Sequence, residues 1–261
     1  KKGTQIRITH AEVLDKDGNF YTENMRAAKT TSTFILNGDE TETFEPRHTF
    51  YGFRYIKIEG LEGELRLEDF EAIPICSGFD RIGEFSSSNP IINQLQHNIE
   101  WGFWGNFVDV PTDCPQRDER LGWTGDAQVF FRTASFLGKV DNFFNKWLSD
   151  LKADQRHDGR VPRIIPDTYS NGDYRTAATG WADASVIIPW NHYMAFGNVN
   201  ILEQQYNSMK GWVDYMVSQS KDRGWLWNNG SHYGDWLFYS LSNDPGGQSA
   251  VTSSHLVAQC F

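Results

Sequence analysis

The sequence predicts two domains, an antiparallel β-sandwich followed by a domain of antiparallel helices. The hydrophobic pattern has a period of two up to about residue 75 and a helical period after residue 88. All 10 Trp lie at or after position 101, whereas residues 1–88 hold 11 Glu and the rest of the chain only three. The 261 residues are enough for two domains of ordinary size. We therefore predict a β-sandwich at 1–78, a linker at 79–88 and a helical domain at 89–261.

The overall composition is that of a globular, soluble protein and excludes several classes of partner. Hydrophobic residues make up 39% of the chain, which is too many for a disordered protein. The net charge of −10 and the lack of a basic cluster argue against binding to nucleic acid or to an anionic membrane. No apolar run approaches the roughly 18–20 residues of a membrane span. The three cysteines, at 76, 114 and 260, lie far apart, so we expect no metal site, while one disulfide remains open.

The first domain is expected to consist of short strands joined by tight turns. Residues 5–10 alternate polar and apolar side chains, as a half-buried strand does. Asp17-Gly18 and Asn37-Gly38-Asp39 are typical hairpin turns. Residues 30–36 and 51–60 are rich in β-branched and aromatic side chains, which favours two further strands.

The second domain is expected to begin with a helix that starts after Asn89. Asn89 is a good N-cap, and Pro90 fits the first helical position. An apolar face follows at the helical spacing, formed by Ile92, Leu95, Ile99 and Phe103. Five more helices are predicted, at 126–137, 140–156, 180–196, 199–221 and 246–261. Antiparallel helices whose loops gather at one end can build a pocket.

The segment between the first two predicted helices carries the chemistry. Residues 109–126 contain five carboxylates, two arginines and a tryptophan, and their prolines and glycines predict a shaped loop. Carboxylates this dense repel one another unless they bind a polyhydroxylated ligand or a cation, or have shifted pKa values. Their spacing does not match the EF-hand pattern for Ca²⁺. A surface loop with Arg–Asp ion pairs is the simpler alternative.

Sugar hydrolysis explains this mixture better than either alternative. A glycosidase needs one protonated carboxylic acid beside the leaving oxygen and a second, ionised carboxylate on the other face of the sugar. Neighbouring acids and an apolar wall raise the pKa of the first group. Aspartates bind ring hydroxyls, and tryptophan faces cover the apolar side of a sugar, so we expect the tryptophans of the second half to build a sugar pocket.

The run from Asp113 to Asp126, Asp-Cys-Pro-Gln-Arg-Asp-Glu-Arg-Leu-Gly-Trp-Thr-Gly-Asp, resembles the signature loop of bacterial α-L-rhamnosidases of glycoside hydrolase family 78. Other segments agree in order, namely Tyr51-Gly-Phe-Arg-Tyr55, Gly180-Trp-Ala-Asp183-Ala, Val186-Ile-Ile-Pro-Trp190 and Gly234-Asp235-Trp236-Leu. The resemblance spans most of the chain and implies a β-sandwich followed by an (α/α)6 barrel. It also implies an inverting reaction on terminal α-L-rhamnose, with no cofactor.

The resemblance implies a role for several residues of this sequence. Glu119 matches the general acid, and an ion pair with Arg117 or Arg120 is its structural alternative. Asp113, Asp126 and Asp183 match acids that contact sugar hydroxyls, although Asp126 and Asp183 also suit helix starts. The remaining matches to substrate-binding residues are Arg117, Trp123, Asp235 and Trp236, where Trp123 could instead be a core residue and Asp235 a turn residue. Cys114 has no histidine partner nearby in sequence and is expected to be structural.

The family barrel needs twelve helices, on the order of 300 residues with about a dozen residues per helix. Residues 89–261 supply about six helices, and no glutamate after Glu203 matches the second catalytic glutamate. We therefore expect the front part of a longer enzyme, inactive by itself, with its general base outside this chain. Two alternatives remain, another sandwich-plus-barrel glycosidase or phosphorylase, and a carbohydrate-binding protein without catalysis. The preferred rhamnoside, the compartment and the oligomeric state remain open.

Overall fold

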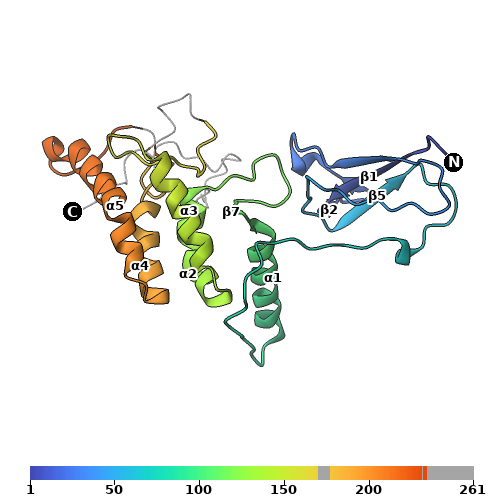
Figure 1. Ribbon diagram of the computed structural model, residues 1–261, viewed down its shortest axis with the longest axis horizontal. Helices are drawn as coiled ribbons and strands as arrows, with labels where there is room; N and C mark the ends of the chain where they lie inside the picture. The colour runs from blue at the N-terminus through green and yellow to red at the C-terminus, as the bar shows by residue number, and fades with distance from the viewer. Residues whose placement is uncertain (170–176, 231, 234–261) are drawn as a thin grey trace.

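The computed structural model describes residues 1–169, 177–230 and 232–233. Strands come first along the chain and helices second, as Figure 1 shows from blue to orange. The predicted order, a sheet domain followed by a helical domain, is confirmed. The predicted helix at 246–261 lies outside the described residues.

The first domain is built on a three-stranded antiparallel sheet. Its central strand is β1 (Gln5–Ala11), with β4 (Thr31–Ile35) on one side and β5 (Tyr55–Glu59) on the other. Ile8 of β1 pairs with Ile58 of β5, which sets the register of this edge. The strand predicted at 51–60 thus begins later than expected: Arg54 still donates its N–H to Ala11 of β1 at 2.9 Å, but Gly52 donates to Pro115 of the helical domain instead.

A short hairpin follows β1 and contains the first predicted turn. β2 (Val13–Leu14) pairs with β3 (Phe20–Tyr21). The Asp15 carboxylate accepts the backbone N–H of Asn19 at 2.7 Å, and Gly18 adopts a φ of 83°, in the left-handed region that glycine tolerates. The prediction of a turn at Gly18 is confirmed.

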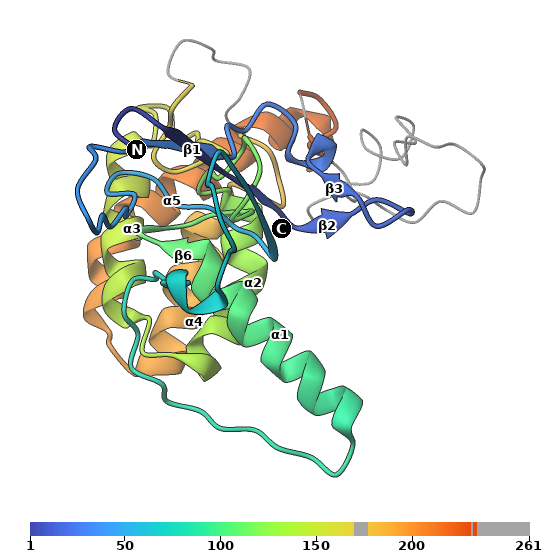
Figure 2. The same cartoon turned by 90° about the vertical axis from the view of Figure 1, so that its right-hand side faces the viewer.

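Five helices form the second domain within the described residues. They are α1 (Pro90–Asn106), α2 (Thr124–Leu137), α3 (Asp141–Asp154), α4 (Ala184–Phe196) and α5 (Asn200–Ser220). α4 packs against α2, α3 and α5, and these four helices form one bundle (Figures 1 and 2). Each helix agrees with its predicted range to within four residues. No helix among the described residues is both long enough and apolar enough to cross a membrane.

Several short elements were not predicted. They are the hairpin of β6 (Phe107–Val108) and β7 (Val110–Pro111), and the single-turn helices η1 (Glu23–Met25), η2 (Leu67–Asp69) and η4 (Lys221–Arg223). The β6–β7 hairpin matters for the site, because it connects α1 to the predicted signature loop.

α1 begins as predicted but packs differently. The Asn89 side chain accepts the backbone N–H of Ile91 at 2.9 Å and caps the helix. Of the predicted apolar face, Phe103 is 1% exposed, whereas Ile92 is 40% and Leu95 53% exposed. The predicted apolar face is therefore buried only toward its C-terminal end, because only the C-terminal half of α1 reaches the other helices. Its N-terminal half projects away from the bundle in Figure 2.

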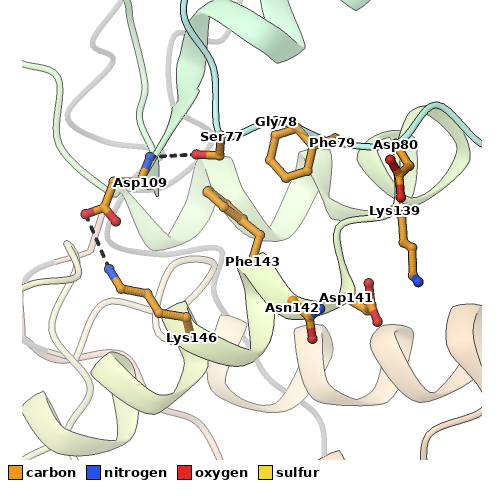
Figure 3. A pocket seen from close by; sticks show the side chains of 10 residues that line it. All are labelled: Ser77, Gly78, Phe79, Asp80, Asp109, Lys139, Asp141, Asn142, Phe143 and Lys146. Atoms are coloured by element: carbon orange, nitrogen blue, oxygen red, sulfur yellow. Dashed lines mark hydrogen bonds and ion pairs between the residues drawn. The ribbon is translucent and has the colours of Figure 1, made fainter.

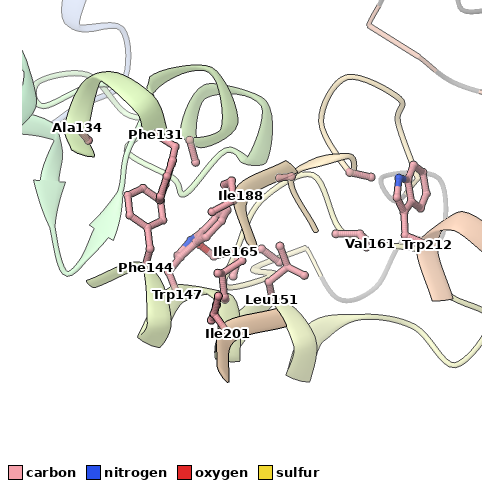
Figure 4. Close-up of a cluster of buried hydrophobic side chains, with 14 of the residues drawn as sticks. Phe131, Ala134, Phe144, Trp147, Leu151, Val161, Ile165, Ile188, Ile201 and Trp212 are labelled. Atoms are coloured by element: carbon pink, nitrogen blue, oxygen red, sulfur yellow. The ribbon is translucent and has the colours of Figure 1, made fainter. Parts of the chain in front are cut away.

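A continuous hydrophobic core holds the bundle together (Figure 4). Trp147 of α3 is fully buried, and its indole N–H donates to the carbonyl of Ile165 at 3.1 Å. Phe131 of α2 meets Phe144 of α3 edge to face, with ring centroids 4.7 Å apart. The core therefore fixes the segment around Ile165 against α2 and α3, and this segment in turn supports the candidate site.

Candidate active site

The acid-rich segment 109–126, which contains the predicted signature run 113–126, extends from the turn of the β6–β7 hairpin through an irregular stretch into the first turn of α2; we call it the acidic loop. Its C-terminal end pairs with the segment around Ile164, because Gly122 accepts the N–H of Ile165 at 2.8 Å and Thr124 donates its N–H to Arg163 at 2.8 Å. A Cβ on Gly122 would lie 2.1 Å from the Ile165 carbonyl oxygen, so only glycine fits there. The end of the acidic loop is thus anchored to the core.

Asp113 closes the acidic loop on itself. One oxygen of its carboxylate accepts the backbone N–H of Leu121 at 3.0 Å, and the other accepts from the Arg117 guanidinium at 3.2 Å. Its side chain is only 6% exposed. This predicted substrate-binding acid therefore shapes the loop, and Arg117 is its ion-pair partner.

Glu119 is held by two arginines that both contact the same oxygen. Oε2 accepts from Nη2 of Arg26 at 2.9 Å and from Nε of Arg117 at 3.3 Å. Among the described residues, no hydrogen-bond partner contacts Oε1. The Glu119 side chain is 26% exposed. The carboxyl group is thus fixed through one oxygen while the other remains available to a ligand.

The sheet domain contacts the acidic loop at two places, which sequence reasoning missed. Arg26, just after η1, pairs through Nε with Asp118 at 2.7 Å, and the same carboxylate accepts the N–H of Ala27 at 3.3 Å. Gly52 donates its backbone N–H to Pro115 at 3.1 Å. The only sequence signal was that Gly52 lies in a segment, Tyr51–Tyr55, that resembles the family.

A second arginine extends this contact between the domains. Arg120 donates to the backbone carbonyl of Phe50 at 3.0 Å, and its guanidinium lies 5.3 Å from the centre of the Phe50 ring. Arg120 also donates to the carbonyl of Arg117 at 3.1 Å. Glu119 forms an ion pair with Arg117 but, among the described residues, none with Arg120.

A cavity of about 580 Å³ opens beside the acidic loop. Its lining combines two carboxylates with apolar and aromatic groups: Ile99, Gly102, Asn106, Phe107, Pro111, Thr112, Asp113, Gly125, Asp126, Ala127, Val129, Phe130, Gly180 and Trp181. The structure therefore brings Asp113 and Asp126 together. Trp181 was not predicted as a site residue, although the quoted segment Gly180–Ala184 contains it.

Gly125 makes the close approach of Trp181 possible. A Cβ on Gly125 would lie 2.8 Å from the indole ring of Trp181. The Trp181 ring also contacts Tyr233, with centroids 4.5 Å apart. The glycine in the acidic loop thus lets an aromatic face lie directly against the first turn of α2, at the wall of the cavity.

Asp126 is the carboxyl of this cavity with a displaced pKa. Partial removal from water at the cavity wall raises its pKa, and the negative charge of Asp113 raises it further, with a smaller contribution from Glu119. Arg117 acts in the opposite direction. Asp126 lies in the first turn of α2, which is the helix-start position considered as the alternative to sugar binding. It also lines the cavity.

Trp123 and Asp183 are placed by structural contacts. Trp123 is the residue before α2, and its ring meets Tyr233 edge to face at 6.0 Å. Its indole nitrogen is buried with no hydrogen-bond partner among the described residues. Asp183 accepts the backbone N–H of Gly180 at 2.7 Å and the indole N–H of Trp212 at 2.8 Å. It occupies the N-cap position of α4 without capping it through its side chain.

Most of the described tryptophans of the second half do not face the cavity. Trp147 and Trp212 are 0% exposed and Trp227 is 4% exposed, and all three belong to the hydrophobic core. The expectation that tryptophan is concentrated in this half because of a sugar pocket is therefore only partly right. A large helical core explains these three, and Trp181 lines the cavity.

The remaining predicted residues lie elsewhere or outside the described chain. Asp235 and Trp236 lie outside the described residues. Cys114 is buried and free, and burial raises the pKa of its thiol, as fits a packing role. Cys76 is free and exposed.

A second cavity, of about 420 Å³, lies between the connection after Ser77, the β6–β7 hairpin and α3 (Figure 3). Asp109 joins two parts of its lining: its backbone N–H donates to the Ser77 hydroxyl at 2.8 Å, and its carboxylate pairs with Lys146 of α3 at 3.4 Å. None of the predicted site residues lines this cavity. Its contacts hold the connection between the domains against α3.

Comparison with known proteins relates both parts of the chain to one family. Residues 80–261 match the bacterial alpha-L-rhamnosidase 6 hairpin glycosidase domain, and residues 1–76 match the bacterial alpha-L-rhamnosidase concanavalin-like domain. An α-L-rhamnosidase of Formosa agariphila is 40% identical over the whole chain, which covers 28% of that protein.

Solved structures give the same result. The Streptomyces avermitilis α-L-rhamnosidase in complex with L-rhamnose is 40% identical with a TM-score of 0.87, over 92% of this chain and 23% of that one. The native α-L-rhamnosidase of Aspergillus terreus is 39% identical with a TM-score of 0.90, and the match covers 99% of this chain and 30% of that one. The chain thus spans about a quarter of the length of these relatives. Because the two domain models together cover nearly all of it, this chain belongs to the bacterial α-L-rhamnosidase family.

Proposed function

We propose that this chain supplies the acid-bearing part of an inverting α-L-rhamnosidase, which releases terminal α-L-rhamnose from rhamnosides or polysaccharides. Glu119 is the general acid, and the general base lies outside this chain. The observation that carries the proposal is the placement of Glu119, whose Oε2 is fixed by Arg26 and Arg117 while Oε1 has no partner among the described residues.

The reaction needs one proton to be delivered and one to be taken up. In the protonated state Glu119 carries the proton on Oε1 and donates it to the glycosidic oxygen as the bond to the anomeric carbon breaks. The electron pair of that bond stays on the leaving oxygen. Water adds to the anomeric carbon from the opposite face, and its proton passes to the general base. Hydrogen bonds to Oε2 favour this arrangement, because they leave Oε1 as the oxygen that can hold the proton.

The cavity beside the acidic loop provides the sugar site of the proposal. Asp113 and Asp126 present carboxylate oxygens that accept from ring hydroxyls, with Arg117 behind Asp113. Trp181 offers an aromatic wall, as does Trp123 in the prediction from the sequence. The S. avermitilis relative, solved with L-rhamnose, supports rhamnose as the ligand.

The other two glutamates of the helical domain do not compete for the acid role. Glu100 is 9% exposed and pairs with Arg81 at 2.6 Å. Glu203 lies exposed in the first turn of α5. Neither these two glutamates nor Glu119 is among the residues that line the cavity, and Glu119 is distinguished by its position in the acidic loop, next to the Arg117 that pairs with Asp113 of the lining. Glu203 is therefore a suitable control for the test of Glu119.

The first test is hydrolysis of p-nitrophenyl α-L-rhamnoside by the complete gene product. Glu119→Gln removes the transferable proton at nearly constant shape, and we expect kcat to fall by about 100-fold or more, whereas Glu203→Gln leaves it unchanged. NMR of the first sugar released should show the anomer inverted. The isolated chain, residues 1–261, is expected to bind L-rhamnose weakly and to hydrolyse nothing.

Each alternative function has its own result in the same experiment. A requirement for phosphate in turnover would indicate a phosphorylase. Rhamnose binding by the complete gene product without any turnover would indicate a carbohydrate-binding protein. Full activity in Glu119→Gln would remove Glu119 as the acid.

A further inference from the structure

We infer that Arg26 of the sheet domain is a positioning residue for the catalytic acid, so that the sheet domain is a working part of the active site. This inference rests on the proposed function of Glu119. Arg26 lies 93 residues before Glu119 in the chain, outside the helical domain and outside every motif of the acidic loop.

The geometry is that of a single guanidinium joining two carboxylates. Nε of Arg26 contacts Asp118 at 2.7 Å, and Nη2 contacts Glu119 at 2.9 Å. The fixed planar fork of arginine suits this double contact, which the single ammonium of a lysine cannot reproduce. Two neighbouring side chains of the loop, which would otherwise repel each other, are thereby held in one orientation.

The backbone around Arg26 holds the guanidinium in place. Arg26 has a φ of 55°, a left-handed conformation that is uncommon for a residue with a side chain. Its N–H donates to the carbonyl of Glu23 at 3.1 Å, and Met25 beside it is 1% exposed. The next residue, Ala27, donates its N–H to Asp118. The segment after η1 is thus fixed both to its own domain and to the acidic loop.

The charges around Glu119 determine what loss of Arg26 would do. They are Arg26 from the sheet domain, Arg117 and Asp118 from the loop, and Asp126 from α2, with Asp113 behind Arg117. Loss of Arg26 would leave Asp118 and Glu119, two adjacent carboxylates of like charge, without the group that joins them. Arg26 therefore orients Glu119 by holding it together with Asp118.

The test is the kinetics of the complete gene product on p-nitrophenyl α-L-rhamnoside, with kcat and KM measured separately. In Arg26→Met we expect kcat to fall about 10-fold or more, because the acid is less well oriented. KM should change by less than about twofold, because Arg26 contacts the acid and is not among the residues that line the cavity.

Arg26→Lys separates charge from orientation. It keeps the cation, but one ammonium cannot hold both carboxylates, so kcat should still fall. Arg66→Met is the matched control, because Arg66 is an exposed arginine of the sheet domain that pairs locally with Asp69, at 2.6 Å. It should change neither kcat nor KM.

The outcome that overturns the inference is an unchanged kcat in Arg26→Met, or wild-type kcat in Arg26→Lys, while Glu119→Gln is inactive. If Arg26→Met does not reach the native Tm, Arg26→Gln, which keeps one hydrogen-bond donor without the charge, takes its place and must show the same fall in kcat. Activity that persists in Glu119→Gln instead contradicts the proposed function itself, so the two failures are distinct.

Discussion

At the scale of single residues, Glu119 of the acidic loop and Asp126 of the cavity lining differ in what surrounds them. Glu119 is contacted by two guanidinium groups on one oxygen. Asp126 has no such contact within the described part of the chain, and the wall of the cavity and the charge of Asp113 raise its pKa. Asp126 is therefore the carboxyl that folding makes harder to ionise, which gives it a measurable effect on stability.

The sign of this effect follows from proton linkage. Because the pKa of Asp126 is higher in the folded protein than in the unfolded chain, the folded state binds the proton more tightly. Stability is highest at low pH, where both states are protonated, and part of it is lost as the pH rises between the two pKa values. At neutral pH the ionised carboxylate therefore destabilises the fold.

We predict that Asp126→Asn raises Tm above that of the wild type at pH 7, and that the difference disappears toward about pH 3. Thermal unfolding followed by circular dichroism across this range measures it. Asp222→Asn, which changes an exposed aspartate in η4, is the control and should give a difference that does not depend on pH. A lower Tm in Asp126→Asn at pH 7 would contradict the prediction. Rhamnose binding should weaken, so that stability and binding change in opposite directions.

At the scale of elements, the sequence predicted the helices well because their signals are local. Asn89 followed by Pro90 marks a helix start by the side chain and ring of two adjacent residues, and the structure has the cap. The exposure of Ile92 and Leu95 could not be predicted, because periodicity identifies an apolar face but not what lies against it. The late start of β5 had a similar cause, since Gly52 pairs with a loop 63 residues away.

The cap of α1 gives a prediction about local stability. Asn89→Ala removes the acceptor for the N–H of Ile91 and should cost about 1 kcal/mol of helix stability. Because the N-terminal half of α1 stands away from the bundle, we expect fraying of this end rather than global destabilisation. Hydrogen exchange of the first-turn amides should become about fivefold faster, with little change in Tm. Asn89→Asp keeps the acceptor and should restore slow exchange; a large drop in Tm in Asn89→Ala would show that the two halves of α1 unfold together.

At the scale of the whole molecule, the candidate site is assembled from both domains. The composition of the acidic loop indicated sugar chemistry, and the family resemblance singled out Glu119 within it. The contacts from Arg26 and Phe50 were beyond sequence reasoning, because pairing between segments 70 or more residues apart leaves no local pattern. Trp181 was missed for a related reason, since its proximity to Gly125 appears only once α2 and the segment before α4 pack together.

Gly52 provides a test of how tightly the domains are joined. A Cβ on Gly52 would lie 3.0 Å from atoms of Pro115 and Gln116, closer than side chains normally approach. We expect Gly52→Ala to separate the sheet domain slightly from the acidic loop and to cost about 1 kcal/mol. Faster hydrogen exchange of the loop amides and weaker L-rhamnose binding should accompany it.

The control for the change in stability is Gly102→Ala in the C-terminal half of α1, whereas L-rhamnose binding is not compared for this variant because Gly102 lines the cavity. There an added methyl has no neighbour within 4 Å, and alanine suits a helix better than glycine. Its stability should be equal to or higher than that of the wild type. Equal stability of Gly52→Ala and Gly102→Ala would mean that the close packing at Gly52 does not contribute to the contact between the domains.

The origin of these contacts has a consequence for how the protein is made. A ribosome delivers the amino end first, and domains tend to fold in that order. The partners of the acidic loop are Arg26, Phe50 and Gly52, which emerge before it, and the segment around Ile164, which follows about 40 residues after its end. The geometry around Glu119 can therefore form on the nascent chain before α4 and α5 leave the exit tunnel.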